Sequence, residues 1–218
     1  MPQYTHAFFD LDGTVTNSAP GITASVRYAM QKLGRRIPDG LDLTAFIGPP
    51  LLYGFSTFCK LNDADTVRAV ALYRENYRAG GMLQCDIYPG IQPLLQELNT
   101  RGTVCVLATC KPHEFATQIL AHLGLSKYFA LVSGPEMDGT RNEKDEVIAY
   151  ALKNLRISDP AAVLMVGDRD NDVLGAKKNG IDCVGVRWGF GSEEELLTAG
   201  AIEVISTPDE LLRFFPAP

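Results

Sequence analysis

Short, continuous runs of apolar residues alternate along this chain with stretches of helical periodicity, and this alternation is the strongest constraint on its fold. The runs lie at Ala7–Leu11, Thr103–Thr109, Ala130–Ser133, Val163–Gly167 and Cys183–Val186, with a weaker one at Ile202–Ile205. Strands that are covered on both faces are continuously apolar, and helices are the usual connections between parallel strands. The sequence therefore predicts an α/β fold in three layers, with a parallel sheet between helices.

The interval between the first two strands is too long to be a simple connection. It contains no convincing buried strand, but it shows helical patterns at Ile22–Leu33, near Leu51–Cys59 and at Asp65–Arg78. A loop of this length without structure of its own is uncommon inside a compact domain. We therefore predict an inserted helical subdomain over residues 17–86, and a core made of residues 1–16 and 87–218.

The charge balance excludes a protein that coats double-stranded nucleic acid. The chain has 20 basic and 26 acidic residues, a net charge of −6, and no basic run that could neutralise phosphates. No apolar run reaches the roughly 18 residues that a membrane span needs. We therefore expect neither nucleic acid nor a membrane among its partners.

The cysteines and the first residues favour a cytoplasmic protein. Five cysteines are an odd number, and none of them forms a C-x-x-C pair. This usage fits free thiols in a reducing compartment better than a disulfide framework. The first residues lack the basic start and the apolar centre of a signal peptide. We expect the protein in the cytoplasm.

Two carboxylates, Asp10 and Asp12, follow the first predicted strand. Residues at i and i+2 of a strand point to the same side, and the carboxyl ends of strands are where open α/β sheets bind ligands. A turn that ends the strand and bends at Gly13 is the alternative interpretation.

A second acidic cluster, Gly-Asp-Arg-Asp-Asn-Asp at 167–172, follows another predicted strand. Crowded carboxylates raise one another's pKa, whereas a hard divalent cation uses such oxygens as ligands. A helix N-terminus enriched in acids is the alternative. Asp168 is the first residue after the predicted strand and is the better candidate for a metal ligand. Asp172 lies one helical turn further on, and we expect it either to bind the cation directly or to support a residue that does. We expect these two, Asp170 and the first carboxylate pair to converge on one site.

Two cationic segments lie between the acidic ones. Thr109, Cys110 and Lys111 offer a hydroxyl, backbone N–H groups and an ammonium at a turn from strand to helix, which suits an anion. Lys144 lies in a charged loop before a predicted helix at Asp145–Leu155. Taken alone, Lys144 is better explained as a solvated surface charge.

Taken in order, Asp-x-Asp-Gly-Thr at 10–14, Thr109, Lys144 and Gly-Asp-x-x-x-Asp at 167–172 resemble the four motifs of the haloacid dehalogenase superfamily. Within it, the whole chain resembles the phosphoglycolate-phosphatase-like branch, which inserts a helical cap of the C1 type between the first and second motifs. The resemblance implies a Rossmann-like core and a cap over 17–86. Two positions depart from the pattern: Cys110 stands where Asn is common, and the loop of Lys144 lacks a Lys-Pro pair.

The resemblance also implies roles for these residues. Asp10 is expected to attack phosphorus and form an aspartyl-phosphate, and Asp12 to act as general acid and base. Asp10, the backbone carbonyl of Asp12, Asp168 and Asp172 are expected to hold Mg²⁺. Thr109 and Lys144 are expected to bind phosphate oxygens, with the amide of Cys110 nearby; Lys111 can share the role of Lys144.

In the cap, Gly48 is expected to let backbone approach a substrate, and Arg27 to meet an anionic one. A plain turn and a solvated helix face are the alternatives for these two residues. The implied function is a Mg²⁺-dependent phosphatase for small-molecule phosphate monoesters, such as phosphoglycolate or a nucleoside monophosphate. The alternatives are a sugar-phosphate mutase of the same superfamily and a non-enzymatic regulatory domain that accepts a phosphoryl group.

Overall fold

The computed structural model describes residues 4–215. The chain forms two compact units: one comprises the chain up to Thr16 and from Ile87 onward, and the other comprises Asn17–Asp86. The chain passes between them through two short strands, β2 (Thr16–Asn17) and β3 (Asp86–Ile87), which together form a two-stranded sheet. Each unit is described by itself below.

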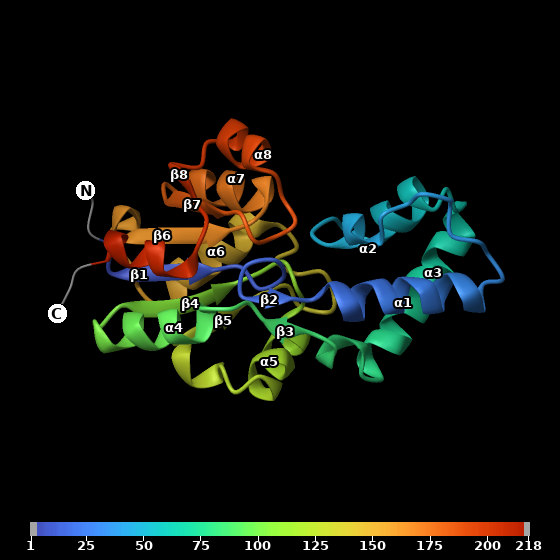
Figure 1. Cartoon of the computed structure of the whole chain (residues 1–218), viewed down its shortest axis with the longest axis horizontal. Coiled ribbons are helices and arrows are strands. Elements are labelled where there is room, and N and C mark those ends of the chain that lie inside the picture. Colours follow the sequence, from blue (N-terminus) through green and yellow to red (C-terminus); the bar gives the residue numbers. More distant parts are fainter. Residues whose placement is uncertain (1–3, 216–218) are drawn as a thin grey trace. The chain divides into compact units, whose positions relative to one another are not determined.

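The larger unit is built on a six-stranded sheet in the order β5-β4-β1-β6-β7-β8, which can be followed in Figure 1. All neighbouring strands are parallel. The predicted parallel α/β fold is therefore confirmed. The strands are β1 (His6–Phe9), β4 (Val104–Ala108), β5 (Leu131–Ser133), β6 (Val163–Gly167), β7 (Asp182–Val186) and β8 (Glu203–Ile205).

Helices cover both faces of this sheet. Successive residues of a strand point to opposite sides, so each strand presents apolar side chains to the helices on both faces. Phe8, Val106 and Met165 are fully buried on the face that packs against α6 and α7. On the opposite face, Cys105 of β4 meets Asn99 of α4, whose amide lies 3.5 Å from the Cys105 sulfur. The helices of this unit are α4 (Ile91–Thr100), α5 (His113–His122), α6 (Lys144–Asn154), α7 (Asp170–Lys178) and α8 (Glu193–Ala199). Short 3₁₀ helices lie at η4 (Ser126–Tyr128), η5 (Pro160–Ala162) and η6 (Pro208–Phe214).

The smaller unit is helical. Its two long helices, α1 (Ala19–Lys32) and α3 (Asp63–Arg78), pack against each other. Arg35, just after α1, forms an ion pair of 2.6 Å with Asp65 of α3. The segment between them contains η1 (Leu43–Phe46), α2 (Leu51–Tyr53) and a single π-helical turn, η2 (Gly54–Phe58); η3 (Gly81–Leu83) follows α3.

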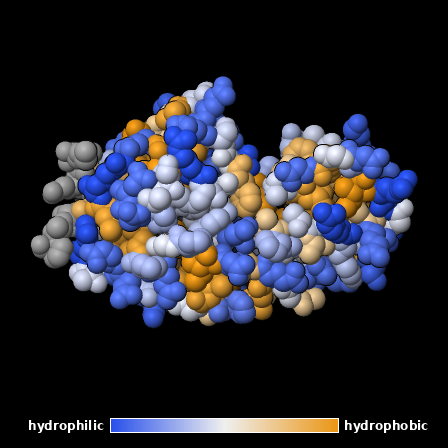
Figure 2. Space-filling model, viewed as in Figure 1, coloured by the Kyte–Doolittle hydropathy of each residue, from blue (hydrophilic) through white to orange (hydrophobic). Residues whose placement is uncertain are grey.

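The surface shows no large uninterrupted apolar area in the view of Figure 2, where hydrophobic patches are broken up by hydrophilic residues. Isolated exposed apolar side chains of this kind are normal for globular proteins. Within residues 4–215, no helix has both the length and the apolar character that crossing a membrane requires.

Candidate active site

Three adjacent strands of the larger unit end in polar residues at the same edge of the sheet. Asp10 follows β1, Thr109 follows β4 and Asp168 follows β6. Asp10 continues the pairing of β1 with β6, because its N–H donates to the carbonyl of Val166 at 3.0 Å. Because parallel strands place their carboxyl ends together, residues far apart in the sequence meet here.

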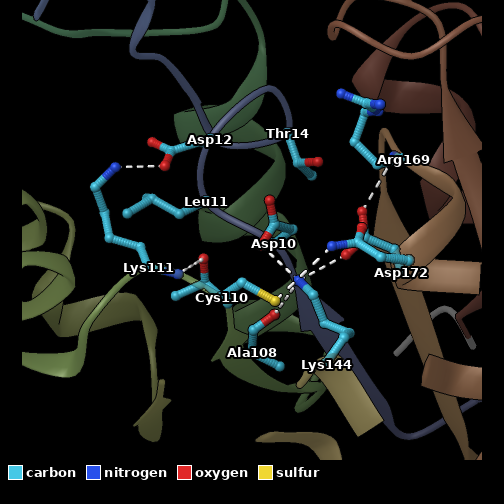
Figure 3. Close-up of polar contacts among 12 residues, drawn as sticks. Asp10, Leu11, Asp12, Thr14, Ala108, Cys110, Lys111, Lys144, Arg169 and Asp172 are labelled. Carbon is cyan, nitrogen blue, oxygen red and sulfur yellow. Dashed lines mark hydrogen bonds and ion pairs between the residues drawn. The ribbon is translucent and has the colours of Figure 1, made fainter. Parts of the chain in front are cut away.

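A buried lysine links two of the carboxylates. The Lys144 ammonium donates to Asp10 Oδ1 at 2.6 Å and to the carbonyl of Ala108 at 3.0 Å, and it lies 2.6 Å from Asp172 Oδ1. Figure 3 shows Lys144 Nζ at the centre of these contacts. The Lys144 side chain is only 3% exposed. The alternative of a solvated surface charge is therefore wrong for Lys144.

Burial and charge act in opposite directions on this group. Burial alone would lower the pKa of the Lys144 ammonium, but the charges of Asp10 and Asp172 outweigh it and raise that pKa well above its ordinary value. Burial raises the pKa of the Asp172 carboxyl, and the ammonium of Lys144 opposes this increase. At neutral pH, Lys144 is thus a fixed positive charge between two acidic side chains.

Asp168 is the most completely enclosed carboxylate of the site, with no exposed surface. Its Oδ2 accepts the N–H of Phe190 at 2.8 Å, and the hydroxyl of Thr14 lies 3.4 Å from its Oδ1. Burial raises the pKa of Asp168 well above its usual range, and the charges of Asp172 and Asp10 add to the increase. A cation bound at Asp168 would relieve the repulsion among these carboxylates.

Three of the predicted carboxylates gather as a candidate metal cluster. Asp10, Asp168 and Asp172 each offer an oxygen, and these oxygens all lie within 4.8 Å of one another. Asp170 does not join them: its side chain is exposed, and its N–H donates to Glu195 at 3.0 Å. The expectation that Asp170 converges on the site is therefore wrong.

Asp12 lies apart from the cluster and pairs with a different lysine. Its Oδ2 accepts a hydrogen bond from the ammonium of Lys111, as Figure 3 shows. Its Oδ1 is buried and has no hydrogen-bond partner among residues 4–215. Lys111 is therefore placed to orient Asp12, whereas Lys144 contacts Asp10.

The turn after β4 supplies the remaining polar groups. Thr109 is buried, and its hydroxyl accepts the N–H of Lys111 at 3.1 Å. Cys110 is partly exposed, and its sulfur lies 3.8 Å from the amide of Asn171. Burial raises the pKa of the Cys110 thiol to about 12, so the sulfur is not a thiolate at neutral pH.

Two predicted substrate residues belong to the smaller unit. Arg27 is exposed on α1, and Gly48 is exposed with a φ of +103°. Their roles stay predictions. Two groups near this edge of the sheet could not be given a role from the sequence: the N–H of Phe190, which donates to Asp168, and the indole of Trp188, which donates to the carbonyl of Thr14. The neighbouring glycines, Gly189 and Gly191, were the available signal, because both approach Asp168 closely.

The fold and this cluster define an α/β enzyme with a carboxylate-rich centre at the carboxyl edge of its sheet. A family model for haloacid dehalogenase-like hydrolases matches residues 7–186. The chain belongs to the haloacid dehalogenase-like hydrolase family, and the predicted resemblance is confirmed.

Individual relatives agree with this family. A 5'-nucleotidase of Pseudomonas aeruginosa is 42% identical over 89% of this chain and 87% of its own length. The tyrosine-protein kinase PtkA of Mycobacterium tuberculosis is 38% identical over 93% of this chain and 69% of its own. The solved structure of a haloacid dehalogenase-like hydrolase from Streptococcus pneumoniae matches with a TM-score of 0.91 and 31% identity, over 98% of this chain and 99% of the other. Phosphoglycolate phosphatases are also among the relatives, and phosphatase is the enzyme class that they support.

Proposed function

We propose that the chain is a Mg²⁺-dependent phosphatase that hydrolyses small-molecule phosphate monoesters through an aspartyl-phosphate on Asp10. The observation that carries the proposal is that Asp10 both contacts the ammonium of Lys144 and belongs to the metal cluster that Asp168 and Asp172 complete. A carboxylate can attack a phosphate dianion only where positive charge offsets the repulsion between them.

The residues present fit a magnesium ion. Asp10, Asp168 and Asp172 supply the hard oxygen ligands that Mg²⁺ prefers. Burial, with the added charges of Asp172 and Asp10, raises the pKa of Asp168, and a bound cation would favour its ionised form. The main-chain carbonyl of Asp12 is our proposed fourth protein ligand. When bound, Mg²⁺ offsets the negative charge of the phosphate and of the carboxylates around it.

In the first step, an oxygen of Asp10 forms a bond to phosphorus while the bond from phosphorus to the ester oxygen breaks. Lys144 holds Asp10 in place for this attack, and the Thr109 hydroxyl and the N–H of Cys110 bind the non-bridging oxygens. Asp12 donates a proton to the leaving alkoxide. Such proton transfer typically contributes ~10²–10⁴ in rate.

In the second step, Asp12 takes a proton from a water molecule, whose oxygen attacks phosphorus. The bond between phosphorus and Asp10 breaks, which releases inorganic phosphate and restores the carboxylate. Dividing one difficult displacement into two easier ones is the advantage of a covalent intermediate.

We propose that the unit over 17–86 is the cap that selects the substrate, with Gly48 and Arg27 as its contacts. The substrate classes are phosphoglycolate-like acids and nucleoside monophosphates. Cytoplasmic location belongs to the same proposal, since no cysteine among the described residues forms a disulfide.

Release of p-nitrophenol from p-nitrophenyl phosphate, measured with Mg²⁺ and with EDTA, tests the activity. Assays of phosphoglycolate and nucleoside monophosphates then rank the substrates by kcat/KM. Release of inorganic phosphate that requires Mg²⁺ supports the proposal. Transfer of the phosphoryl group to a sugar hydroxyl without phosphate release would identify a mutase, and a stable phosphoprotein without turnover would identify a regulatory domain.

Metal binding should also be visible as stability. Mg²⁺ at about 100 times its Kd should stabilise the protein by about 2.7 kcal/mol, and EDTA should reverse this in thermal denaturation. Asp168→Asn should melt at a higher temperature than the wild type without metal, because one of the crowded charges is gone, and should gain no stability from Mg²⁺. A full Mg²⁺ response in Asp168→Asn would contradict the assigned metal site.

Lys111 provides a test of how Asp12 is oriented. We expect Lys111→Met to lower kcat about 10-fold or more with little change in KM, because the variant loses the hydrogen bond that holds Asp12. Steady-state kinetics separate the two parameters, and Lys127→Met, which changes an exposed lysine of the same unit, is the matched control. A rise in KM at constant kcat would instead mean that Lys111 binds the substrate phosphate.

A further inference from the structure

Two loops of the larger unit close around the Asp168 side chain, and glycines make this approach possible. A Cβ on Gly13 would lie 2.1 Å from Asp168 Oδ2, and a Cβ on Gly189 would lie 2.3 Å from Asp168 Cβ. A Cβ on Gly191 would lie 1.9 Å from the carbonyl oxygen of Asp168. The main chain of both loops, 11–16 and 187–191, therefore lies directly against Asp168.

The tryptophan between these glycines joins the two loops. The indole N–H of Trp188 donates to the main-chain carbonyl of Thr14 at 3.0 Å. The two loops each offer Asp168 one donor, the Thr14 hydroxyl at 3.4 Å and the Phe190 N–H at 2.8 Å. The indole bond thus joins the two loops whose donors, the Thr14 hydroxyl and the Phe190 N–H, contact the Asp168 carboxylate.

The start of the second loop is anchored independently of Trp188. The Arg187 guanidinium pairs with both carboxylate oxygens of Glu193, and the N–H of Arg187 donates to the carbonyl of Ile205 at 3.0 Å. This end of the loop is thus fixed to the sheet, and the indole bond is a separate attachment that joins the loop to residues 11–16.

We propose that Trp188 is a positioning residue for the metal site: its bond to Thr14 holds the two loops together and thereby fixes the Asp168 carboxylate for binding of a divalent cation. The inference rests on the proposed function, because it assumes a cation at Asp168. Trp188 acts through other residues and contacts neither the cation nor the substrate. Loss of groups that orient metal ligands typically costs about 10–100-fold in metal affinity or activity.

Trp188 is the only tryptophan of the chain, so it reports on its own environment. Titration of the metal-free wild type with Mg²⁺ should change the tryptophan fluorescence and saturate at the concentration that saturates the thermal stabilisation. The same titration of Asp168→Asn should give no change. A wild type whose melting temperature responds to Mg²⁺ while its fluorescence does not would overturn the proposal, and this readout requires no change at Trp188.

The second arm measures the Mg²⁺ dissociation constant of Trp188→Phe by isothermal titration calorimetry. We expect a Kd about 10-fold higher than that of the wild type. The matched control is Tyr4→Phe, which removes a hydrogen bond of 2.7 Å to Asp182 in the same unit. This control should lose stability and keep the wild-type Kd.

The outcomes separate the inference from the function on which it rests. An unchanged Kd in a folded Trp188→Phe overturns the positioning role and leaves the proposed phosphatase intact. Equal weakening by Trp188→Phe and Tyr4→Phe also overturns it, because a general loss of stability would then explain both. A wild type that binds no Mg²⁺ overturns both the inference and the proposed function.

Discussion

Asp10→Asn should abolish turnover of p-nitrophenyl phosphate, lowering kcat by about 10⁴-fold or more, which is the scale of removing a covalent nucleophile. The amide is a poor nucleophile, and it also weakens the metal cluster to which Asp10 contributes an oxygen. The variant should remain folded, because the substitution removes one negative charge from three crowded carboxylates. Steady-state kinetics with saturating Mg²⁺, together with the melting temperature, measure both effects.

The matched control for this substitution is Asp170→Asn. Asp170 lies in the same acidic sequence as two of the cluster carboxylates, but its side chain is exposed and outside the cluster. It should therefore keep near-wild-type kcat. Activity that survives Asp10→Asn would contradict the covalent mechanism. An equal loss of kcat in Asp170→Asn would show that the overall charge of this segment matters more than the position of Asp10 in the cluster.

Lys144→Met should be the most destabilising substitution in the site. It leaves Asp10 and Asp172 buried together without their shared ammonium, and removing one partner of a buried ion pair typically costs about 3–5 kcal/mol. Lys144 is also the group that orients Asp10, so kcat should fall by about 10²–10³-fold. Urea denaturation with EDTA present measures the free energy of unfolding without help from metal.

Two further variants isolate the electrostatic cause. Lys153→Met changes an exposed lysine of the same helix and should alter stability by less than about 0.5 kcal/mol. The double variant Lys144→Met with Asp172→Asn should recover part of the lost stability, because it removes one of the two uncompensated charges. No recovery in the double variant would mean that packing of the lysine stem, and not charge, accounts for the loss.

The inner strands of the sheet could be predicted from the sequence because most of their residues are buried on both faces. The predicted strand Val163–Gly167 has the observed bounds of β6, and the weak run at Ile202–Ile205 corresponds to β8 (Glu203–Ile205). The segment near Leu51–Cys59 was harder: it forms a short α-helix and then a π-helical turn. Apolar spacing over one or two turns cannot distinguish these helix types, since their periods differ too little.

Site residues that directly follow a strand could be placed from the sequence, whereas those on helices and loops were harder to place. Asp10 and Asp168 each come directly after a strand of the sheet, so topology alone brings them together. Asp170 was misplaced because it begins a helix, where residues two apart point to nearly opposite sides. The pairing of Lys111 with Asp12 joins side chains that no local pattern relates, and only the folded chain shows it.

The central position of β1 also determines when the site can form during folding. β1 is made first, but it pairs with β4 through His6 and Val104 and with β6 through His6 and Val163. Both partners lie far along the chain, and such distant pairings are slow because loop-closure entropy must be overcome before the contacts form. The set of partners of Asp10 is therefore incomplete until synthesis has passed Asp172, and shorter nascent chains should have no partial activity.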